Sequence, residues 1–321
     1  MKYVLFLTGF LFFYHLTNGQ IYRVQDMTTS QLDSLDKEKT IVLLPGGILE
    51  EHGPYLPSFT DGYMNLALAD SIAKEITKRP GLKVLIFPLI PLGNSGANDI
   101  PRKYTFPGTF AIRQTTLRNV LMDLASEIGD QGYKNIFVIH MHGGPNHNQA
   151  IDQASEYFTD IYKGRMVNIW NLAVRVSIAV LDSNQRNEDG FSVHAGIMEH
   201  SLLFYLQPQF QTSAYKTAKP QKAAGRADLT IVAGKKDWPG YWGAPHMASI
   251  ELGNKAWTKW TNGILSQINK ILDNAYDFTQ PTYYQMMSLV PEQKAVNEDA
   301  IKHEQNKEVK QREWLKKKGL N

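Results

Sequence analysis

The chain has 321 residues, 43% of them hydrophobic and 20% charged, which is ordinary for a globular protein with one large domain or two modest ones. Its formal charge of +3 is too small to indicate a nucleic-acid partner. Because there is no cysteine, disulfides and cysteine nucleophiles are excluded, and any metal site must use His, Asp and Glu, which suit Zn, Mn or Fe.

The first nineteen residues have the layout of a secretory signal peptide. Lys2 gives a short basic start, an apolar run extends from Val4 to Phe13, and small residues occupy positions 17–19. The apolar run is shorter than the ~20 residues that a membrane-spanning helix needs. We therefore predict cleavage near Gly19 and a soluble exported protein, periplasmic or secreted, without stable membrane insertion. An uncleaved anchor is the alternative.

Predicted strands alternate with predicted helices through the first half of the chain. Unbroken apolar runs indicate buried strands, and apolar residues at helical spacing indicate helices. The strands are expected at 40–44, 83–90, 135–140 and 165–170, and the helices at 63–76, 117–128 and 149–162. This alternation is typical of βαβ units. It predicts a single α/β domain over residues 20–290, with a mainly parallel sheet flanked by helices on both faces.

The second half of the chain is less regular. Residues 183–249 are rich in Gly, Pro, Trp and Tyr and are expected to form long loops over the site, apart from a helix at 196–206. Another helix is expected at 257–272. The last segment, 291–321, contains a basic run and is predicted to be a charged helix or a frayed tail.

Side chains that can bind metal follow two of the predicted strands. Glu50 and His52 lie in a glycine- and proline-rich loop after the first strand, and Asp61 comes at the start of the next helix. His142 follows the third strand, between two other histidines and just before a glycine pair. Ligands gather beyond the carboxyl ends of parallel strands. Each cluster alone fits polar side chains of a loop that bind no metal, but two clusters at strand ends favour a metal site.

A third cluster runs from His194 to His200 and opens the helix predicted at 196–206. Glu199 falls in the first turn of that helix. A carboxylate there is also stabilised by the helix dipole, so a purely structural role for Glu199 stays open.

The three clusters, in this order, resemble the motifs of the creatininase family of creatinine amidohydrolases, over residues 41 to 265. The first motif is similar to Glu50-Glu51-His52-Gly53-Pro54-Tyr55-Leu56-Pro57 followed by Asp61. Later motifs are similar to Phe106-Pro107-Gly108-Thr109, His142-Gly143-Gly144, His194-Ala195-Gly196-Ile197-Met198-Glu199 and Trp242-Gly243-Ala244-Pro245. The departures, which concern the substrate, are Tyr55, Met141, Pro145, His200 and Ala244.

The resemblance implies two divalent metal ions, Zn, Mn or Fe, in each subunit of a homo-oligomer, often a hexamer. Glu50 and His142 would hold one ion, His52 the other, and Asp61 would bridge them. Some members carry a glutamate at the position of Gly144. Glu199 is then the candidate for the missing carboxylate ligand and a catalytic residue. His194 is the candidate acid/base or substrate contact.

Such a site predicts hydrolysis of a C–N bond in a small amide or cyclic amide. A water that bridges two divalent ions loses its proton near neutral pH and attacks the carbonyl carbon, while His194 protonates the leaving nitrogen. A deformylase-type reaction is one alternative. Another is a periplasmic metal- or solute-binding protein without catalysis, which would not need several carboxylates. Three aromatic residues form either the pocket walls or loop packing: Trp238, Tyr241 and Trp242.

Overall fold

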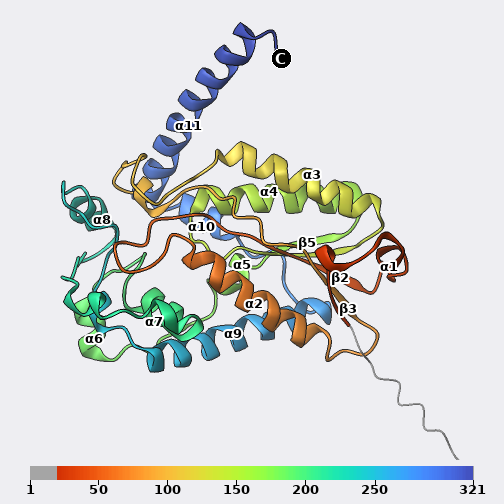
Figure 1. Ribbon diagram of the computed structural model, residues 1–321, viewed down its shortest axis with the longest axis horizontal. Coiled ribbons are helices and arrows are strands. Elements are labelled where there is room, and N and C mark those ends of the chain that lie inside the picture. Colours follow the sequence, from red (N-terminus) through yellow and green to blue (C-terminus); the bar gives the residue numbers. More distant parts are fainter. Residues whose placement is uncertain (1–19, 321) are drawn as a thin grey trace, which may run out of the picture.

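The computed structural model describes residues 20–320, so the predicted signal peptide, 1–19, lies outside the described residues. A five-stranded sheet crosses the centre of the molecule (Figure 1), and every pair of neighbouring strands in it is parallel. The strand order is β1-β3-β2-β4-β5. The strands are β1 (Ile21–Arg23), β2 (Thr40–Pro45), β3 (Lys83–Ile86), β4 (Asn135–Ile139) and β5 (Arg165–Asn168).

Helices cover both faces of the sheet (Figure 1), which confirms the predicted α/β fold. One face packs against α2 (Thr60–Ile76), α5 (Trp170–Ala173), α7 (Ile197–Leu206) and α9 (Ile250–Leu272). The other packs against α1 (Thr29–Asp33), α3 (Gln114–Asp130) and α4 (Pro145–Tyr162).

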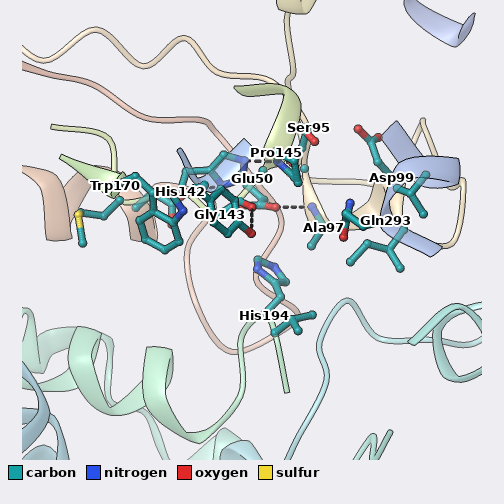
Figure 2. A pocket seen from close by; sticks show the side chains of 18 of the residues that line it. Glu50, Ser95, Ala97, Asp99, His142, Gly143, Pro145, Trp170, His194 and Gln293 are labelled. Carbon is teal, nitrogen blue, oxygen red and sulfur yellow. Dashed lines mark hydrogen bonds and ion pairs between the residues drawn. The ribbon is translucent and has the colours of Figure 1, made fainter. Parts of the chain in front are cut away.

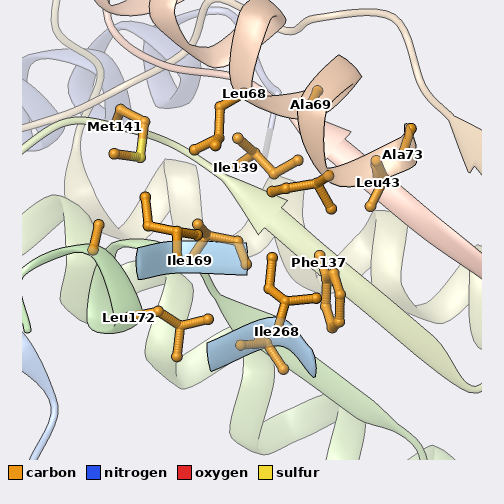
Figure 3. Packing of buried hydrophobic residues seen from close by; sticks show 14 of the residues in the cluster. Leu43, Leu68, Ala69, Ala73, Phe137, Ile139, Met141, Ile169, Leu172 and Ile268 are labelled. Atoms are coloured by element: carbon orange, nitrogen blue, oxygen red, sulfur yellow. The ribbon is translucent and has the colours of Figure 1, made fainter. Parts of the chain in front are cut away.

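The core forms because the central strands are apolar on both faces. Leu43 of β2 and Phe137 of β4 are fully buried, in one cluster with residues of α2 and α9 such as Leu68 and Ile268 (Figure 3). Each large side chain buried in this way contributes about 1.5–3 kcal/mol. The result is a rigid layer whose strand ends hold the loops of the site.

Several element boundaries differ from the sequence-based prediction. β1 has only three residues and was missed, and β3 ends at Ile86, before Pro88, which has no N–H for a sheet ladder. Helix α4 begins at Pro145 rather than at 149, because proline is favoured in the first turn of a helix. Helix α9 begins seven residues earlier than predicted, where the Ser249 side chain accepts a hydrogen bond from the Leu252 N–H at 3.1 Å.

The region 183–249 is more helical than predicted. Besides α7 it contains α6 (Ser183–Asp189) and α8 (Arg226–Ala233). Short 3-10 helices occur at η1 (Val24–Asp26), η2 (Ala97–Asp99), η3 (Pro208–Phe210), η4 (Ser213–Thr217) and η5 (Pro245–Met247).

The chain ends in α10 (Tyr283–Ser288) and the long helix α11 (Pro291–Lys317). The first part of α11 contacts the body of the protein, and its last turns project away from it (Figure 1). Of the two alternatives for residues 291–321, a charged helix is therefore the one observed over 291–317. In the described part of the chain, no helix combines the length and apolar character that crossing a membrane requires.

Candidate metal centre

The site lies where the three central strands end. The loop after β2 carries Glu50 and His52, the first turn of α2 carries Asp61, and the loop after β4 carries His142. All four side chains are almost completely buried, at 5% exposure or less. The structure thus brings together four residues that the sequence analysis selected, from segments up to 92 positions apart.

Three of these residues form the first ligand group. His142 Nδ1 lies 3.1 Å from Glu50 Oε2 and 3.2 Å from Asp61 Oδ2. One atom from each of the three residues lies within 4.8 Å of the others. A nitrogen and two carboxylate oxygens at this spacing suit a divalent transition-metal ion.

A second group of possible ligands, with one atom from each of Glu50, His52 and His194 within 4.8 Å of the others, lies on the side of Asp61 that faces His52. His52 Nε2 is 3.4 Å from Asp61 Oδ1 and 4.0 Å from Glu199 Oε2. His194 joins this side, with its Nδ1 3.7 Å from Glu199 Oε2 and its ring 4.3 Å from that of His52. The two oxygens of Asp61 thus face different histidines, Oδ2 towards His142 and Oδ1 towards His52.

Each of the three histidines is fixed by one ring nitrogen. His142 Nε2 lies 3.0 Å from the carbonyl oxygens of Asn94 and Ser95, and His52 Nδ1 lies 3.1 Å from the Glu50 carbonyl oxygen. His194 Nε2 is 2.5 Å from the Glu51 carbonyl oxygen. These contacts place a proton on the anchored nitrogen and turn the lone pair of the other nitrogen towards the carboxylates, as is usual for histidines that bind metal.

The buried atoms at the centre fit a metal ion. His52 Nε2 and Asp61 Oδ2 are both buried and have no hydrogen-bond partner among residues 20–320. A buried polar atom without a partner is costly, and a cation between the facing lone pairs satisfies it. The donor set therefore fits divalent ions at this position.

Without metal, the same cluster holds protons tightly. Burial alone would lower the pKa of His52, but its close contact with Asp61 and the nearby carboxylates raise that pKa to about 10. The pKa of His142 is likewise raised well above its usual value, against the effect of burial, by Glu50 and Asp61. Metal ions and protons must therefore compete for these nitrogens.

Gly144 occupies a crowded position in the loop after β4. A Cβ atom there would lie 2.5 Å from both His142 Nε2 and the Ser95 carbonyl oxygen. These atoms are held by their own contacts, so no longer side chain fits without a shift of the loop. A carboxylate ligand from position 144 is therefore sterically disfavoured with the loop as it stands in this structure.

Glu199 is the most accessible of the selected acids, with its side chain 29% exposed. It lies in the first turn of α7, and its Oε2 accepts a hydrogen bond from the Ala195 N–H. Ala195 has a φ of +48°, an unusual value for a residue with a side chain. This strained turn directs the carboxylate towards His52 and His194.

Two other histidines near the site form a structural pair. His140 Nδ1 lies 3.0 Å from His147 Nε2, and His147 Nδ1 accepts the Asn94 N–H at 3.1 Å. Burial lowers the pKa of His140 to about 3. Both rings are therefore neutral, and they support the loop that carries His142.

A cavity of about 240 Å³ opens over the first ligand group. Figure 2 shows Glu50, His142 and His194 at its centre. Of the two alternatives for Trp238, Tyr241 and Trp242, loop packing is the one observed, because all three are buried and none lines the cavity. The observed wall residues include Ile100, Trp170, Val193, Tyr283 and Val296.

Three charged residues near the site were not selected from the sequence. Glu51 is buried behind His194, and burial, with the neighbouring Glu50, raises its pKa to about 9. Glu51 stands next to Glu50 in the first motif, and that position is the feature of the sequence from which it could have been selected. Asp99 and Arg226 line the cavity but stand in no recognisable motif.

Comparison with known proteins agrees with this geometry. The family model described as "Creatininase: Creatinine amidohydrolase" matches residues 25–268. A mycofactocin precursor peptide peptidase of Mycolicibacterium smegmatis is 26% identical over 247 residues, which are 76% of this chain and 89% of that protein. A protein of the same name from Mycobacterium ulcerans is 30% identical over 124 residues, 37% of this chain and 46% of that protein.

Solved creatininase structures share the fold. A manganese form of creatininase has a TM-score of 0.60 at 18% sequence identity, covering 78% of this chain and 98% of the other. A creatininase variant of the Zn–Zn type has a TM-score of 0.58 at 19% identity, covering 79% and 99%. The resemblance seen in the sequence motifs is thus confirmed over most of the chain.

Proposed function

Because this chain belongs to the creatininase family of metal-dependent amidohydrolases, we propose that it hydrolyses a C–N bond in a small amide or cyclic amide with two divalent ions. The observation that supports two ions is the arrangement around Asp61. One of its oxygens faces His142, which also contacts Glu50, and the other faces His52, whose Nε2 lies 4.0 Å from Glu199.

In this proposal Glu50, Asp61 and His142 hold one ion, and His52, Asp61 and Glu199 hold the other. Bound ions of this kind lower the pKa of a water molecule and polarise the carbonyl of the scissile amide. The other steps belong to side chains of this chain.

His194 is the proposed acid/base: its Nδ1 would accept a proton from the attacking water and then donate it to the leaving nitrogen. Its Nε2 is held by the Glu51 carbonyl oxygen at 2.5 Å, so its Nδ1 faces Glu199 and the cavity. A histidine held in this way transfers a proton without having to reorient. Glu199 lies between His194 and His52, where its carboxylate orients the His194 ring as well as binding metal.

The size and burial of the cavity favour a small substrate. Its volume of about 240 Å³ is below the ~300–1,000 Å³ of pockets that take drug-sized ligands. The curated relatives are named as peptidases, so a short peptide amide belongs beside lactams, ureides and formamides among the candidates. Formate release would identify the deformylase-type reaction.

The Asp61→Asn variant tests this function, with Asp70→Asn as its matched control. Both residues lie on α2, but Asp70 is exposed and pairs with Arg23. We expect the wild type to hold two ions by elemental analysis and to hydrolyse at least one of the candidate amides. Asp61→Asn should lose most of both ions and at least ~100-fold in kcat/KM, since even supporting residues cost 10–100-fold in metal affinity. A metal-free wild type, or full activity in Asp61→Asn, contradicts the proposal.

We also propose that the protein acts after export, on the basis of residues 1–19. N-terminal sequencing of protein from its native host tests this. A mature start near Gln20 is expected, and an intact Met1 on membrane-bound protein contradicts it.

A further inference from the structure

One wall of the cavity comes from a part of the chain that the family model does not match. Tyr283, Gln293 and Val296 line the cavity, and all three follow residue 268, where the match ends. The Tyr283 hydroxyl donates a hydrogen bond of 2.9 Å to the Gly143 carbonyl oxygen, which ties this wall to the loop that carries His142. The wall is therefore part of the site, and it is a feature of this chain rather than of the matched family region.

Arg226 joins this wall at the start of α8. Its Nη1 donates a hydrogen bond of 2.9 Å to Gln293 Oε1, and its guanidinium lies 5.5 Å from the centre of the Phe191 ring. Gln293 is itself fixed, because its Nε2 donates to Asn297 Oδ1 at 2.9 Å. Figure 2 shows Gln293 on the side of the cavity near Ala97 and Asp99. The arginine is thus held in place at the cavity by residues that carry no charge.

Arg226 has no acidic partner. Among residues 20–320, no carboxylate oxygen lies within 4.0 Å of its guanidinium nitrogens, and no protein acceptor bonds its Nε or Nη2. It is also the only lysine or arginine among the cavity-lining residues of this described range. A guanidinium presents two parallel N–H groups whose geometry matches a carboxylate.

We propose that the substrate of this enzyme carries a carboxylate, and that Arg226, oriented by Gln293, binds it while the scissile amide lies at the metal centre. This inference rests on the proposed function, which places the amide of the substrate at the metal centre. It narrows the substrate class to small acylamino acids, carboxylated lactams or ureides, and short peptides with a free carboxyl terminus. Arg226 is a binding residue that determines specificity, and it takes no part in the bond cleavage.

Among the acids that line the cavity, Asp99 argues most directly against a bound substrate carboxylate, because two carboxylates repel each other. It does not pair with Arg226, and burial together with Glu304 raises its pKa to about 7. When it is protonated, the Asp99 carboxyl can donate a hydrogen bond to an anion instead of repelling it. The remaining acids of the cavity, Glu50, Asp61 and Glu199, belong to the proposed metal ligands.

Equilibrium binding to the metal-loaded protein tests the proposal without requiring turnover. The probes are the methanesulfonamides of 3-aminopropanoate, 4-aminobutanoate and 5-aminopentanoate, which vary the distance between the amide-like group and the carboxylate. Each is compared with its neutral twin, in which a primary alcohol replaces the carboxylate. We expect titration calorimetry to show that at least one acid binds about 10- to 100-fold more tightly than its twin, as for hydrogen bonds to charged groups.

Arg226→Gln should reduce the ratio of acid affinity to alcohol affinity to nearly one, and Arg226→Lys should keep part of the preference for the acid. A probe carboxylate that binds the metal directly would raise the affinity equally in wild type and variant. It therefore does not contribute to the difference between their acid-to-alcohol affinity ratios. Gln293→Glu supplies Arg226 with an internal partner and should also abolish the preference, which keeps the test decisive if Arg226→Gln does not fold. Arg118→Gln is the matched control: Arg118 lies on α3, bonds only Asn119 and does not line the cavity.

The proposal is overturned if no acid is preferred by the wild type, or if the preference survives in Arg226→Gln or Gln293→Glu. Failure of the proposed function has a different signature, namely a metal-loaded protein that hydrolyses none of the candidate amides. That result does not affect the difference in binding between wild type and the Arg226 variants.

Discussion

Glu199 combines two features that point to different roles. It begins helix α7, where a carboxylate gains about 0.3–1 kcal/mol from the helix dipole, and its Oε2 lies 4.0 Å from His52 Nε2. Without Glu199, the proposed ligand set leaves the second ion only His52 and the bridging Asp61. Its positive charge would then be poorly neutralised. We therefore predict that Glu199→Gln lowers the metal content from two ions towards one and abolishes turnover, as measured by elemental analysis and activity.

Glu251→Gln is the control for a helix-dipole role, because Glu251 is an exposed acid in the first turn of α9. It should change stability slightly and leave metal content unaltered. Two tightly held ions and normal activity in Glu199→Gln would show that Glu199 serves only the helix.

Metal affinity should rise with pH. In the metal-free protein the pKa of His52 is raised to about 10 and that of His142 is raised well above its usual value, by the nearby carboxylates and against burial. Below these values each ion must displace protons, so the apparent affinity falls as the pH falls. We expect at least about a tenfold gain in affinity per pH unit between pH 6 and 9 if one proton is released, measured with a competing chelator.

Proton release provides an independent check of that prediction. Titration calorimetry in buffers of different ionisation enthalpy should show one or more protons released per ion near pH 7. An affinity independent of pH over this range would mean that the histidines are already neutral.

At the residue level, the sequence was most informative where ligands follow strand ends directly. Glu50, His52 and His142 could be selected because the carboxyl ends of parallel strands share one edge of the sheet. Arg226 and Gln293 could not, since their meeting depends on how α8 and α11 pack and neither residue stands in a motif. For Trp242 the pattern gave no choice between pocket wall and loop packing, and the structure shows it fully buried.

At the level of elements, helix α11 has two parts with different roles. Glu304 accepts hydrogen bonds from Asn94 Nδ2 at 2.6 Å and from the Gln114 N–H at 2.8 Å, next to the loop that anchors His142. Beyond Val309 the side chains are mostly exposed. We predict that Glu304→Ala lowers the free energy of unfolding by about 1–3 kcal/mol, whereas truncation after Val309 changes it by less than about 0.5 kcal/mol.

Chemical denaturation of the two variants measures this difference. The reverse order of effects would mean that the projecting turns of α11, and not Glu304, fasten the helix to the body.

Local patterns predicted the sheet better than they predicted the segments around it. Apolar runs such as 40–44 and 135–140 are buried on both faces, so composition alone reveals them. Helices α6 and α8 are only seven and eight residues long and lie in a region rich in loop-forming residues. Such short helices are stabilised by packing against other elements, and the periodicity of the sequence does not reveal that packing.

For the whole molecule, bound metal should contribute to folding stability, because the ligands come from three separate segments that meet only in the native state. An ion at 100 times its dissociation constant adds about 2.7 kcal/mol for one site. Removing both ions with a chelator should therefore lower the Tm by at least about 5 °C, measured by calorimetry. The Asp61→Asn variant should show a much smaller shift on chelation, and equal shifts would place the stabilising metal elsewhere.

The crowding at Gly144 also limits the evolutionary routes open to this protein. A Cβ there would meet His142 Nε2 and the Ser95 carbonyl oxygen at 2.5 Å, and those two atoms already contact each other at 3.0 Å. A change from glycine to glutamate at position 144 alone would therefore force His142 or Ser95 to shift, so it requires compensating changes in the 87–113 loop that carries Ser95.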